Sequence, residues 1–245
     1  MVIWYLRRPV VWGELIRGGA RRMRGPVPDE RPAASARCAE LAVPREQAAE
    51  ALGFELVDVT ELEEYQRARK LLAERGVHVA GAGDTAMLYS ACLGTRPGSV
   101  LETGVAHGLS SLAILLALSS NGSGCLTSID MPYRGSSDDA YVGQAVPQDL
   151  RSGWTLLRVP DRRGLSRATK SGPFDVVHYD SDKTRAGREF AYPRLWSMLR
   201  SGGVFLSDDV GDDLAFVEFA ASVGVTPTIW RKADGGDFVG GFSKP

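Results

Sequence analysis

From residue 99 onward the sequence alternates between short apolar segments and helical segments, and this alternation constrains the fold more than any other feature. Helices are expected at residues 110–120, 187–200 and 212–224. Strands are expected at residues 99–105, 125–131, 154–159, 174–180, 203–210, 226–232 and 237–244. Strands that alternate with helices form βαβ units, because parallel neighbours need a long crossover. We therefore predict an α/β fold with a doubly wound, mostly parallel sheet, helices on both faces and an antiparallel C-terminal strand.

Two further helices are expected before the first strand. Thr60 followed by Glu63 resembles a capping box, and Gly76 can end the helix that follows it. Asp84 can cap the next helix. We therefore place the start of the main domain near residue 58 and expect it to extend over residues 58–245.

Residues 1–57 are predicted to be an N-terminal extension and linker that is partly helical. Residues 33–52 are rich in Ala and Glu and favour a helix. Residues 1–26 contain six Arg and one Glu, and Gly13, Gly18 and Gly19 argue against a long helix there. We expect this basic arm to pack on the main domain or on a partner subunit, which leaves a homo-oligomer open.

Composition excludes several classes of protein. The 29 basic and 30 acidic residues leave a net charge of −1, which argues against a dedicated nucleic-acid binder. No apolar run is long enough for stable insertion into a membrane. Cys38, Cys92 and Cys125 are far apart in the sequence and are expected to be free thiols, so we predict a cytoplasmic protein.

A glycine-containing loop follows the first predicted strand. Gly104 and Gly108 allow a tight turn and a close ligand, and Ser110 or Ser111 can cap the next helix. The loop lacks the lysine of a phosphate loop and the third glycine of a dinucleotide fingerprint. The second strand ends at Asp130, which can accept hydrogen bonds from ribose hydroxyls.

These segments resemble a class I S-adenosylmethionine-dependent methyltransferase. The resemblance rests on E-T-G-x-x-x-G-x-S from residue 102, the second strand ending in Asp130, and LWSMLRSGGVFLSDDV at residues 195–210. It implies a seven-stranded Rossmann-like fold. It also implies that Glu102 and Gly104 line the methionine part of the cofactor, and that Asp161 meets the adenine edge. The full set of expected cofactor-binding residues is Glu102, Gly104, His107, Gly108, Ser110, Asp130, Asp161 and Asp180.

Carboxylates end the fourth and fifth predicted strands. Asp180 follows one strand, and Asp208 and Asp209 follow the next. Because the carboxyl ends of neighbouring parallel strands lie together, we expect these three groups to converge. Converging carboxylates repel each other unless a cation intervenes, and oxygen ligands suit Mg²⁺. The alternative is that Asp208 and Asp209 cap the helix that begins near Asp212.

The acidic segments are similar to the metal-dependent catechol and caffeoyl-CoA O-methyltransferase branch. D-S-D-K at residues 180–183 matches its pattern, whereas Asp209 stands where that branch usually has Asn. The resemblance implies that Asp180, Asp208 and Asp209 bind the metal and that Lys183 is the base. His178 is the competing base, although it could equally be a packed residue of the sheet.

We therefore expect an enzyme that transfers a methyl group from S-adenosyl-L-methionine to a hydroxyl of a small-molecule acceptor, assisted by Mg²⁺. A phenol, a sugar or another secondary metabolite would fit as the acceptor. The alternatives are a metal-independent methyltransferase with His178 as base, a non-catalytic cofactor-binding partner subunit, and a nicotinamide oxidoreductase. The missing third glycine disfavours the last of these.

Overall fold

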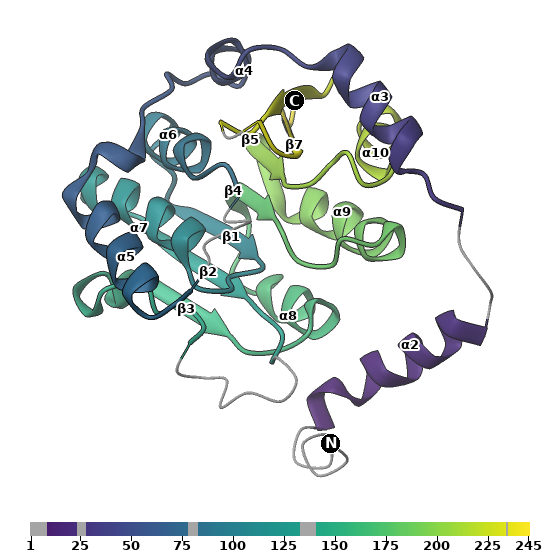
Figure 1. The fold of residues 1–245 in the computed structure, drawn as a ribbon, viewed down its shortest axis with the longest axis horizontal. Coiled ribbons are helices and arrows are strands. Elements are labelled where there is room, and N and C mark those ends of the chain that lie inside the picture. The colour runs from purple at the N-terminus through teal and green to yellow at the C-terminus, as the bar shows by residue number, and fades with distance from the viewer. Residues whose placement is uncertain (1–8, 24–27, 78–82, 133–140, 234) are drawn as a thin grey trace.

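The computed structural model describes residues 9–23, 28–77, 83–132, 141–233 and 235–245. Its centre is one seven-stranded sheet with the strand order β3-β2-β1-β4-β5-β7-β6 (Figure 1). β7 is antiparallel to both of its neighbours, and the other pairs are parallel. The predicted fold class is therefore confirmed. The strands are β1 (Ser99–Thr103), β2 (Cys125–Ile129), β3 (Trp154–Leu157), β4 (Phe174–Tyr179), β5 (Leu199–Ser207), β6 (Thr228–Arg231) and β7 (Phe238–Ser243).

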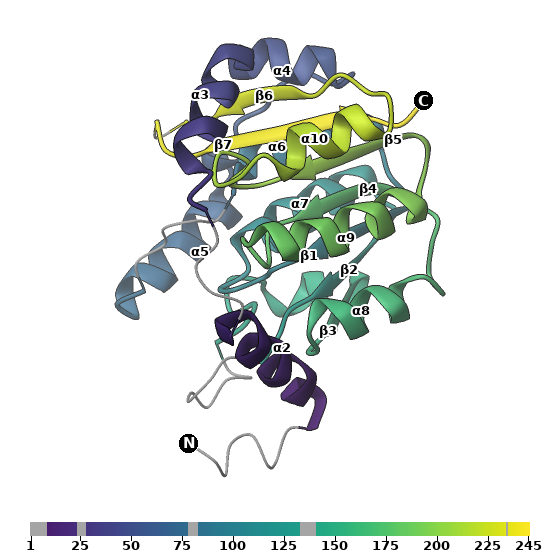
Figure 2. The ribbon, with the colours of Figure 1, turned by 90° about the vertical axis from the view of Figure 1, so that its right-hand side faces the viewer.

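Helices cover both faces of the sheet, and each face has its own apolar core (Figure 2). One core joins the sheet to α4 (Arg45–Ala51), α5 (Glu63–Glu74), α6 (Thr85–Thr95) and α7 (Leu109–Asn121). The other joins it to α3 (Arg31–Leu41), α8 (Asp161–Ala168), α9 (Arg185–Met198) and α10 (Ala215–Ser222). Short 3₁₀ turns lie at η1 (Pro9–Val11), η2 (Val59–Glu61) and η4 (Gln148–Gly153). Side chains alternate between the two cores along each strand, as the pleat requires.

The N-terminal region differs from its prediction in one respect. A helix, α2 (Trp12–Met23), forms despite its three glycines, so the expectation of no long helix there was wrong. The predicted helix at residues 33–52 is divided into α3 and α4, which both contact β6. Ala42, between these two helices, forms a parallel bridge with Ile229 of β6. Residues 31–51 thus pack directly on the edge of the sheet, while the proposed domain boundary at residue 58 stays a prediction.

Two predicted helix caps were wrong. Asp58, rather than Thr60, accepts a backbone hydrogen bond, and α5 begins at Glu63 without a side-chain cap. α7 begins after Gly108, which adopts φ 90°, and Ser110 and Ser111 lie inside the helix. The predicted cap of α6 is confirmed, because the Asp84 carboxylate accepts from Met87 N. Capping residues were misplaced where a glycine or an extended residue opens the helix instead.

Among the described residues, every helix is too short or too polar to cross a bilayer. The three cysteines are free thiols, of which Cys38 and Cys92 are buried and Cys125 is exposed.

Candidate active site

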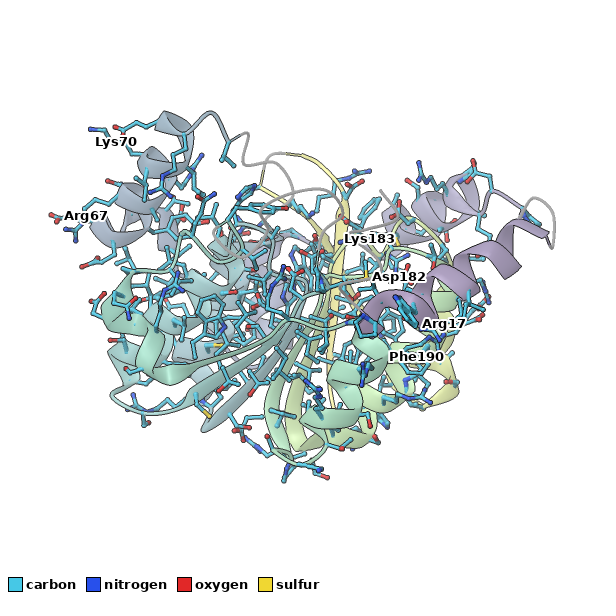
Figure 3. All side chains as sticks on the ribbon, turned by 90° about the horizontal axis from the view of Figure 1, so that it is seen from below. Arg17, Arg67, Lys70, Asp182, Lys183 and Phe190 are labelled. Atoms are coloured by element: carbon cyan, nitrogen blue, oxygen red, sulfur yellow. The ribbon has the colours of Figure 1, made fainter. Side chains whose placement is uncertain are left out.

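A cavity of about 420 Å³ lies beyond the carboxyl ends of β1, β2 and β4. In Figure 3, Asp182 and Lys183 lie near the centre of the molecule, with Arg17 of α2 and Phe190 of α9 beside them. The volume is typical of a site for a small ligand or cofactor. The cavity is lined by Glu14, Gly104, Asp130, Met131, Asp161, Arg162, Asp180, Ser181, Asp182, Lys183, Gly187 and Phe190.

The loop after β1 is held close to the strand beside it. Gly104 adopts φ 83°, and a Cβ at this position would lie 2.2 Å from the carbonyl oxygen of Asp180. Only glycine tolerates both the positive φ and this approach. Gly108 likewise packs against Gly143, where a Cβ would come within 2.7 Å of its Cα. Close packing against neighbouring backbone therefore explains both glycines of the motif. At Gly104, this packing also shapes the wall of the cavity.

The Asp130 carboxylate holds the glycine loop in place through hydrogen bonds to its backbone. Its Oδ2 accepts hydrogen bonds from the backbone N–H groups of Val105 and Ala106, both at 2.8 Å, and Arg158 approaches its Oδ1 at 3.0 Å. Burial raises the pKa of this carboxyl, and the two N–H groups oppose that effect. Asp130 thus lines the cavity while it anchors the loop after β1.

Asp161 is the first residue of α8 and lies across the cavity from α2. Its carboxylate accepts a hydrogen bond from the hydroxyl of Ser181, which follows β4. Burial raises the pKa of Asp161 to about 6, and the Ser181 hydroxyl partly opposes the shift. The residue is therefore an acceptor on the cavity wall whose charge changes near neutral pH.

Four of the eight predicted cofactor residues line the cavity, namely Gly104, Asp130, Asp161 and Asp180. The other four, as far as the described chain shows, lie behind its wall. The Glu102 Oε2 accepts from Ser111 Oγ (2.5 Å) and Ser128 Oγ (2.7 Å) inside the core. His107 Nδ1 hydrogen-bonds Gln144 at 2.8 Å, Ser110 is buried, and Gly108 forms the tight contact described above. A role for these four in cofactor binding stays a prediction.

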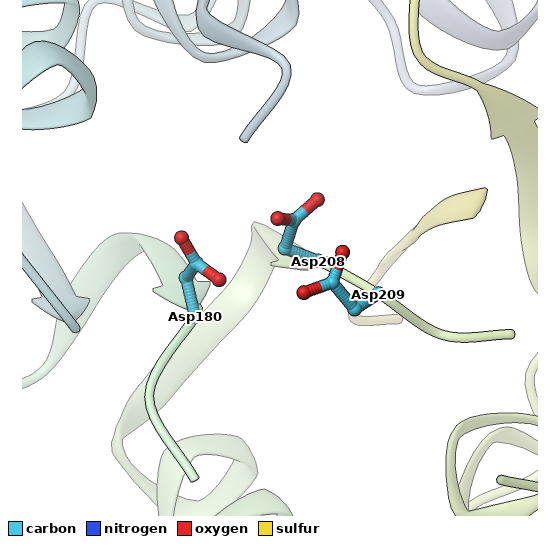
Figure 4. Close-up of side chains that lie close together, drawn as sticks. All are labelled: Asp180, Asp208 and Asp209. Atoms are coloured by element: carbon cyan, nitrogen blue, oxygen red, sulfur yellow. The ribbon is translucent and has the colours of Figure 1, made fainter. Parts of the chain in front are cut away.

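The three predicted metal ligands do converge (Figure 4). One carboxylate oxygen from each of Asp180, Asp208 and Asp209 lies within 4.8 Å of the others. Two lysines lie among them. Lys183 Nζ bonds Asp180 and lies 2.6 Å from Asp209 Oδ2, and Lys232 Nζ lies 2.8 Å from Asp208 Oδ2 and 3.0 Å from Asp209 Oδ1. We call these five residues the carboxylate–lysine cluster.

Burial and neighbouring charges shift the pKa values of this cluster in opposite directions. Burial, together with repulsion from Asp180 and Asp209, raises the pKa of Asp208 to about 7. Burial also works against ionisation of Asp209, but Lys183 and Lys232 outweigh it and hold its pKa below the usual value. For Lys183, burial favours the neutral amine, yet the three carboxylates raise its pKa. Lys183 is therefore an ammonium group in this state of the protein.

The cluster fits a hard divalent cation. Its donors are all carboxylate oxygens, which Mg²⁺ prefers. Asp208 Oδ1 is buried and has no hydrogen-bond partner among the described residues, although such an atom normally has one. The alternative assignment of Asp208 and Asp209 as helix caps was wrong, because Asp213 accepts from Ala215 N at the start of α10.

His178 lies on β4 directly beside Glu102 of β1 and is 2% exposed. Its Nδ1 lies 3.8 Å from Glu102 Oε1, and neither atom has a hydrogen-bond partner in the described part of the chain. His178 points to the opposite face of the sheet from Val177 and Tyr179, as the alternation predicts. It contributes nothing to the lining of the cavity described above.

A buried arginine joins the two loops that carry the cluster. Arg188 of α9 is fully buried and donates to the carbonyl oxygens of Lys183 (3.3 Å) and Asp209 (2.6 Å). It also pairs with Asp213, at 2.7 Å, and with Asp212, at 3.8 Å. Asp209 adopts φ 52°, which is strained for a residue with a side chain, and the hydrogen bond to its carbonyl helps hold that conformation.

Sequence reasoning missed Lys232, Arg188 and Glu14. The alternation of side chains offered a signal for Lys232, since Trp230 is buried in the same core as Leu206, two residues before Asp208. Lys232 and Asp208 therefore leave their strands on the same face. Glu14 carried no such signal, because its helix was not expected.

Comparison with known proteins identifies the class. Residues 101–210 match the family model described as "Methyltransferase domain". Comparison with curated protein sequences finds no match.

Solved structures share the fold at low sequence identity. The O-methyltransferase TomG from Streptomyces achromogenes, involved in tomaymycin synthesis and solved with S-adenosylmethionine, is 18% identical with a TM-score of 0.56, over 76% of this chain and 91% of its own. The O-methyltransferase from Bacillus cereus, solved with S-adenosylhomocysteine, is 14% identical with a TM-score of 0.59, over 84% and 100%. A methyltransferase from Geobacter sulfurreducens is 18% identical with a TM-score of 0.56, over 83% and 99%.

The sheet and its covering helices thus form the Rossmann-like fold of class I methyltransferases. Residues 101–210 match the methyltransferase domain family within this fold, as the predicted resemblance implies.

Proposed function

We propose that this protein transfers a methyl group from S-adenosylmethionine to a hydroxyl oxygen of a small-molecule acceptor. The observation that carries the proposal is the charge of the cavity beside the carboxylate–lysine cluster. Its described lining has five carboxylates, from Glu14, Asp130, Asp161, Asp180 and Asp182, against the two cations Arg162 and Lys183. An acidic wall suits a cofactor with a sulfonium and an ammonium group, and it repels the pyrophosphate of a nicotinamide dinucleotide.

Each wall of the cavity has a role in this proposal. Asp130, at the end of β2, accepts from the ribose hydroxyls, and Asp161 accepts from the adenine amine. The backbone of Gly104 allows the methionine part to approach β1. The methyl group then lies toward Asp180 and Lys183, which belong to both the cavity and the cluster.

The acceptor reacts at the cluster. Its hydroxyl oxygen forms a bond to the methyl carbon, the bond from sulfur to that carbon breaks, and the electron pair stays on the sulfur. Lys183 Nζ takes the hydroxyl proton after it has released its own proton to solvent. Asp180, Asp208 and Asp209 would hold a Mg²⁺ ion, whose positive charge would lower the pKa of the acceptor hydroxyl and of Lys183. Arg188 keeps the two loops at a fixed spacing, so that oxygen and sulfonium stay in line.

The acceptor class is a phenol, a sugar or another secondary metabolite. The involvement of TomG in tomaymycin synthesis supports a secondary metabolite. A metal-independent reaction with His178 as base is the second candidate. It is favoured by the unpartnered Nδ1 of His178, and disfavoured by the burial of this side chain behind the cavity wall.

Calorimetry with S-adenosylmethionine and with NAD, followed by methyl-transfer assays on catechols, other phenols and sugars with and without EDTA, tests the proposal. We expect S-adenosylmethionine to bind, NAD not to bind, and EDTA to abolish turnover. Full turnover in EDTA would contradict the metal-assisted reaction and would favour His178 as the base. Cofactor binding without turnover on any acceptor would instead favour a non-catalytic partner subunit.

A further inference from the structure

A second lysine, which is not among the residues that line the cavity, reaches the carboxylates from another strand. Lys232 follows β6, its side chain is 11% exposed, and its Nζ bridges Asp208 Oδ2 and Asp209 Oδ1. Lys183 approaches from the loop after β4 and bridges Asp180 and Asp209. Asp209 therefore lies between two ammonium groups, one on each of its oxygens.

The charges of the cluster nearly cancel. With all three carboxylates ionised, the two ammonium groups leave one negative charge, whereas Lys183 alone would leave two. Lysine is rare in this chain, with five residues against 24 arginines, so two of the five lysines meet at this point. An ammonium group is a compact point charge, unlike the wide fork of arginine, and it fits between two adjacent carboxylates.

The cluster nevertheless retains an unused ligand atom. Asp208 Oδ1 is buried and, among the described residues, has no hydrogen-bond partner, while Lys232 occupies the other oxygen of the same carboxylate. A cation bound here would have the free Asp208 Oδ1 as a ligand. The positive charge of Lys232 would lie about as near to it as the carboxylate oxygens. Attraction and repulsion of this kind act strongly at such distances in a partly buried site.

We propose that Lys232 is a positioning residue that neutralises Asp208 and Asp209 and thereby limits how tightly the cluster holds a divalent cation. This inference rests on the proposed function, because it concerns the metal-assisted site. Lys232 keeps the acidic loop ordered without an ion, and the cluster binds a divalent cation weakly and reversibly. A lysine that only supported the fold would act in the opposite direction, since its loss would loosen the ligands and weaken binding.

The test is calorimetric titration of Mn²⁺ into the full chain freed of metal with EDTA, for the wild type, Lys232→Met and Lys232→Arg. We expect Lys232→Met to bind Mn²⁺ about tenfold more tightly or better, because one positive charge beside the ion is gone. Lys232→Arg keeps the charge and should bind no more tightly than the wild type. Lys70→Met is the matched control, because Lys70 lies on α5, far from Lys183, and is mostly exposed (Figure 3). Its Mn²⁺ affinity should not change.

Equal or weaker Mn²⁺ binding by Lys232→Met would overturn the proposal, as would an absence of binding by both the wild type and this variant. Lys232→Gln replaces Lys232→Met if thermal unfolding shows that the latter does not fold, and the same outcomes apply. S-adenosylmethionine binding in EDTA is measured on the same samples. If the cofactor fails to bind there, the proposed function fails, whatever the Mn²⁺ titration gives.

Discussion

The two halves of the site hold their carboxylates in different ways. On the cofactor side, Asp130 is held by two backbone N–H groups of the glycine loop and by Arg158. On the acceptor side, Asp208 and Asp209 are held by Lys183 and Lys232, and one oxygen of Asp208 lacks a partner within the described chain. Backbone donors are fixed by the fold, whereas lysine side chains have rotatable stems and can be displaced.

This difference indicates which half is preorganised. The cofactor half needs no rearrangement to accept a ligand, because its shape is set by hydrogen bonds along β1 and β2. In the acceptor half, a metal ion has to replace a lysine ammonium group beside the carboxylates, or a proton has to move between neighbouring charged groups. We therefore expect substitutions in the cofactor half to alter affinity and stability, and substitutions in the acceptor half to alter the rate and the metal dependence.

The largest effect is expected for Lys183→Met on the acceptor side. Loss of the proposed base should lower kcat/KM by about 10²–10⁴-fold, the range typical of general acid–base groups. Calorimetry should show an S-adenosylmethionine Kd within a few-fold of the wild type. Lys183→Arg, which keeps the charge but cannot act as a base at neutral pH, is the control and should be nearly as inactive. If Lys183→Met kept most of its turnover, His178→Ala would be the next variant.

On the cofactor side, Asp130→Ala should weaken S-adenosylmethionine binding and destabilise the fold. It leaves the N–H groups of Val105 and Ala106 without their acceptor, which costs about 1–3 kcal/mol in the free energy of unfolding. Urea unfolding measures this loss, and calorimetry measures the Kd. Asp130→Asn retains one acceptor oxygen and should show a smaller loss of both. An unchanged Kd in Asp130→Ala would show that this half is not organised by Asp130.

A smaller, pH-dependent effect is expected at Asp161, whose pKa is raised to about 6 by burial. The proposed bond from the adenine amine needs the carboxylate, so S-adenosylmethionine affinity should fall as the pH drops through 6. The raised pKa also means that ionised Asp161 costs stability above pH 6, and that this cost disappears as the pH falls toward the ordinary value of 3.8.

The matched variant is Asp161→Asn, which cannot ionise. Between pH 7 and 4 the wild type should gain thermal stability relative to this variant, while its advantage in S-adenosylmethionine affinity should shrink. Parallel curves for the two proteins would contradict the assignment of Asp161.

The smallest effect is expected at Glu14, the contribution of α2 to the cavity wall. Arg17 of the same helix already pairs with this carboxylate, so its charge is partly screened. Glu14→Gln should raise the S-adenosylmethionine Kd about two- to threefold, in the range of an exposed ion pair. Exposed Glu64→Gln on α5 is the control. A tenfold loss of S-adenosylmethionine affinity would show that α2 has a central rather than a peripheral role in the cofactor half.

The sequence predicted the parts of the molecule that follow from periodicity. Alternating segments gave the sheet, and the carboxyl ends of neighbouring strands placed Asp180 beside Asp208 and Asp209. The helix over residues 12–23 was not predicted, because glycine propensity is a weak prior that tertiary contacts override. The caps at Thr60 and Ser110 were misplaced, because local spacing alone does not show which residue opens a helix.

Lys232 escaped prediction for a topological reason. β6 is the outermost strand and meets β5 only through β7, so side-chain alternation indicates the face of residue 232 but not that it lies near residue 208. Likewise, the chemistry of Glu102 and His178 depends on which face of the sheet each side chain occupies and on what packs there. Sequence spacing identified the residue types, and the three-dimensional packing decided which of them meet.

The insertion of β7 between β5 and β6 also has a consequence for the order of assembly. Asp180, Asp208 and Asp209 are brought together by β4 and β5 alone, but Lys232 is carried into place by the hairpin of β6 and β7. During synthesis the acidic loops therefore leave the ribosome before the strand that delivers their counter-charge. Until β7 pairs with β5, the nascent chain therefore holds the three carboxylates with only one of their two lysines in place.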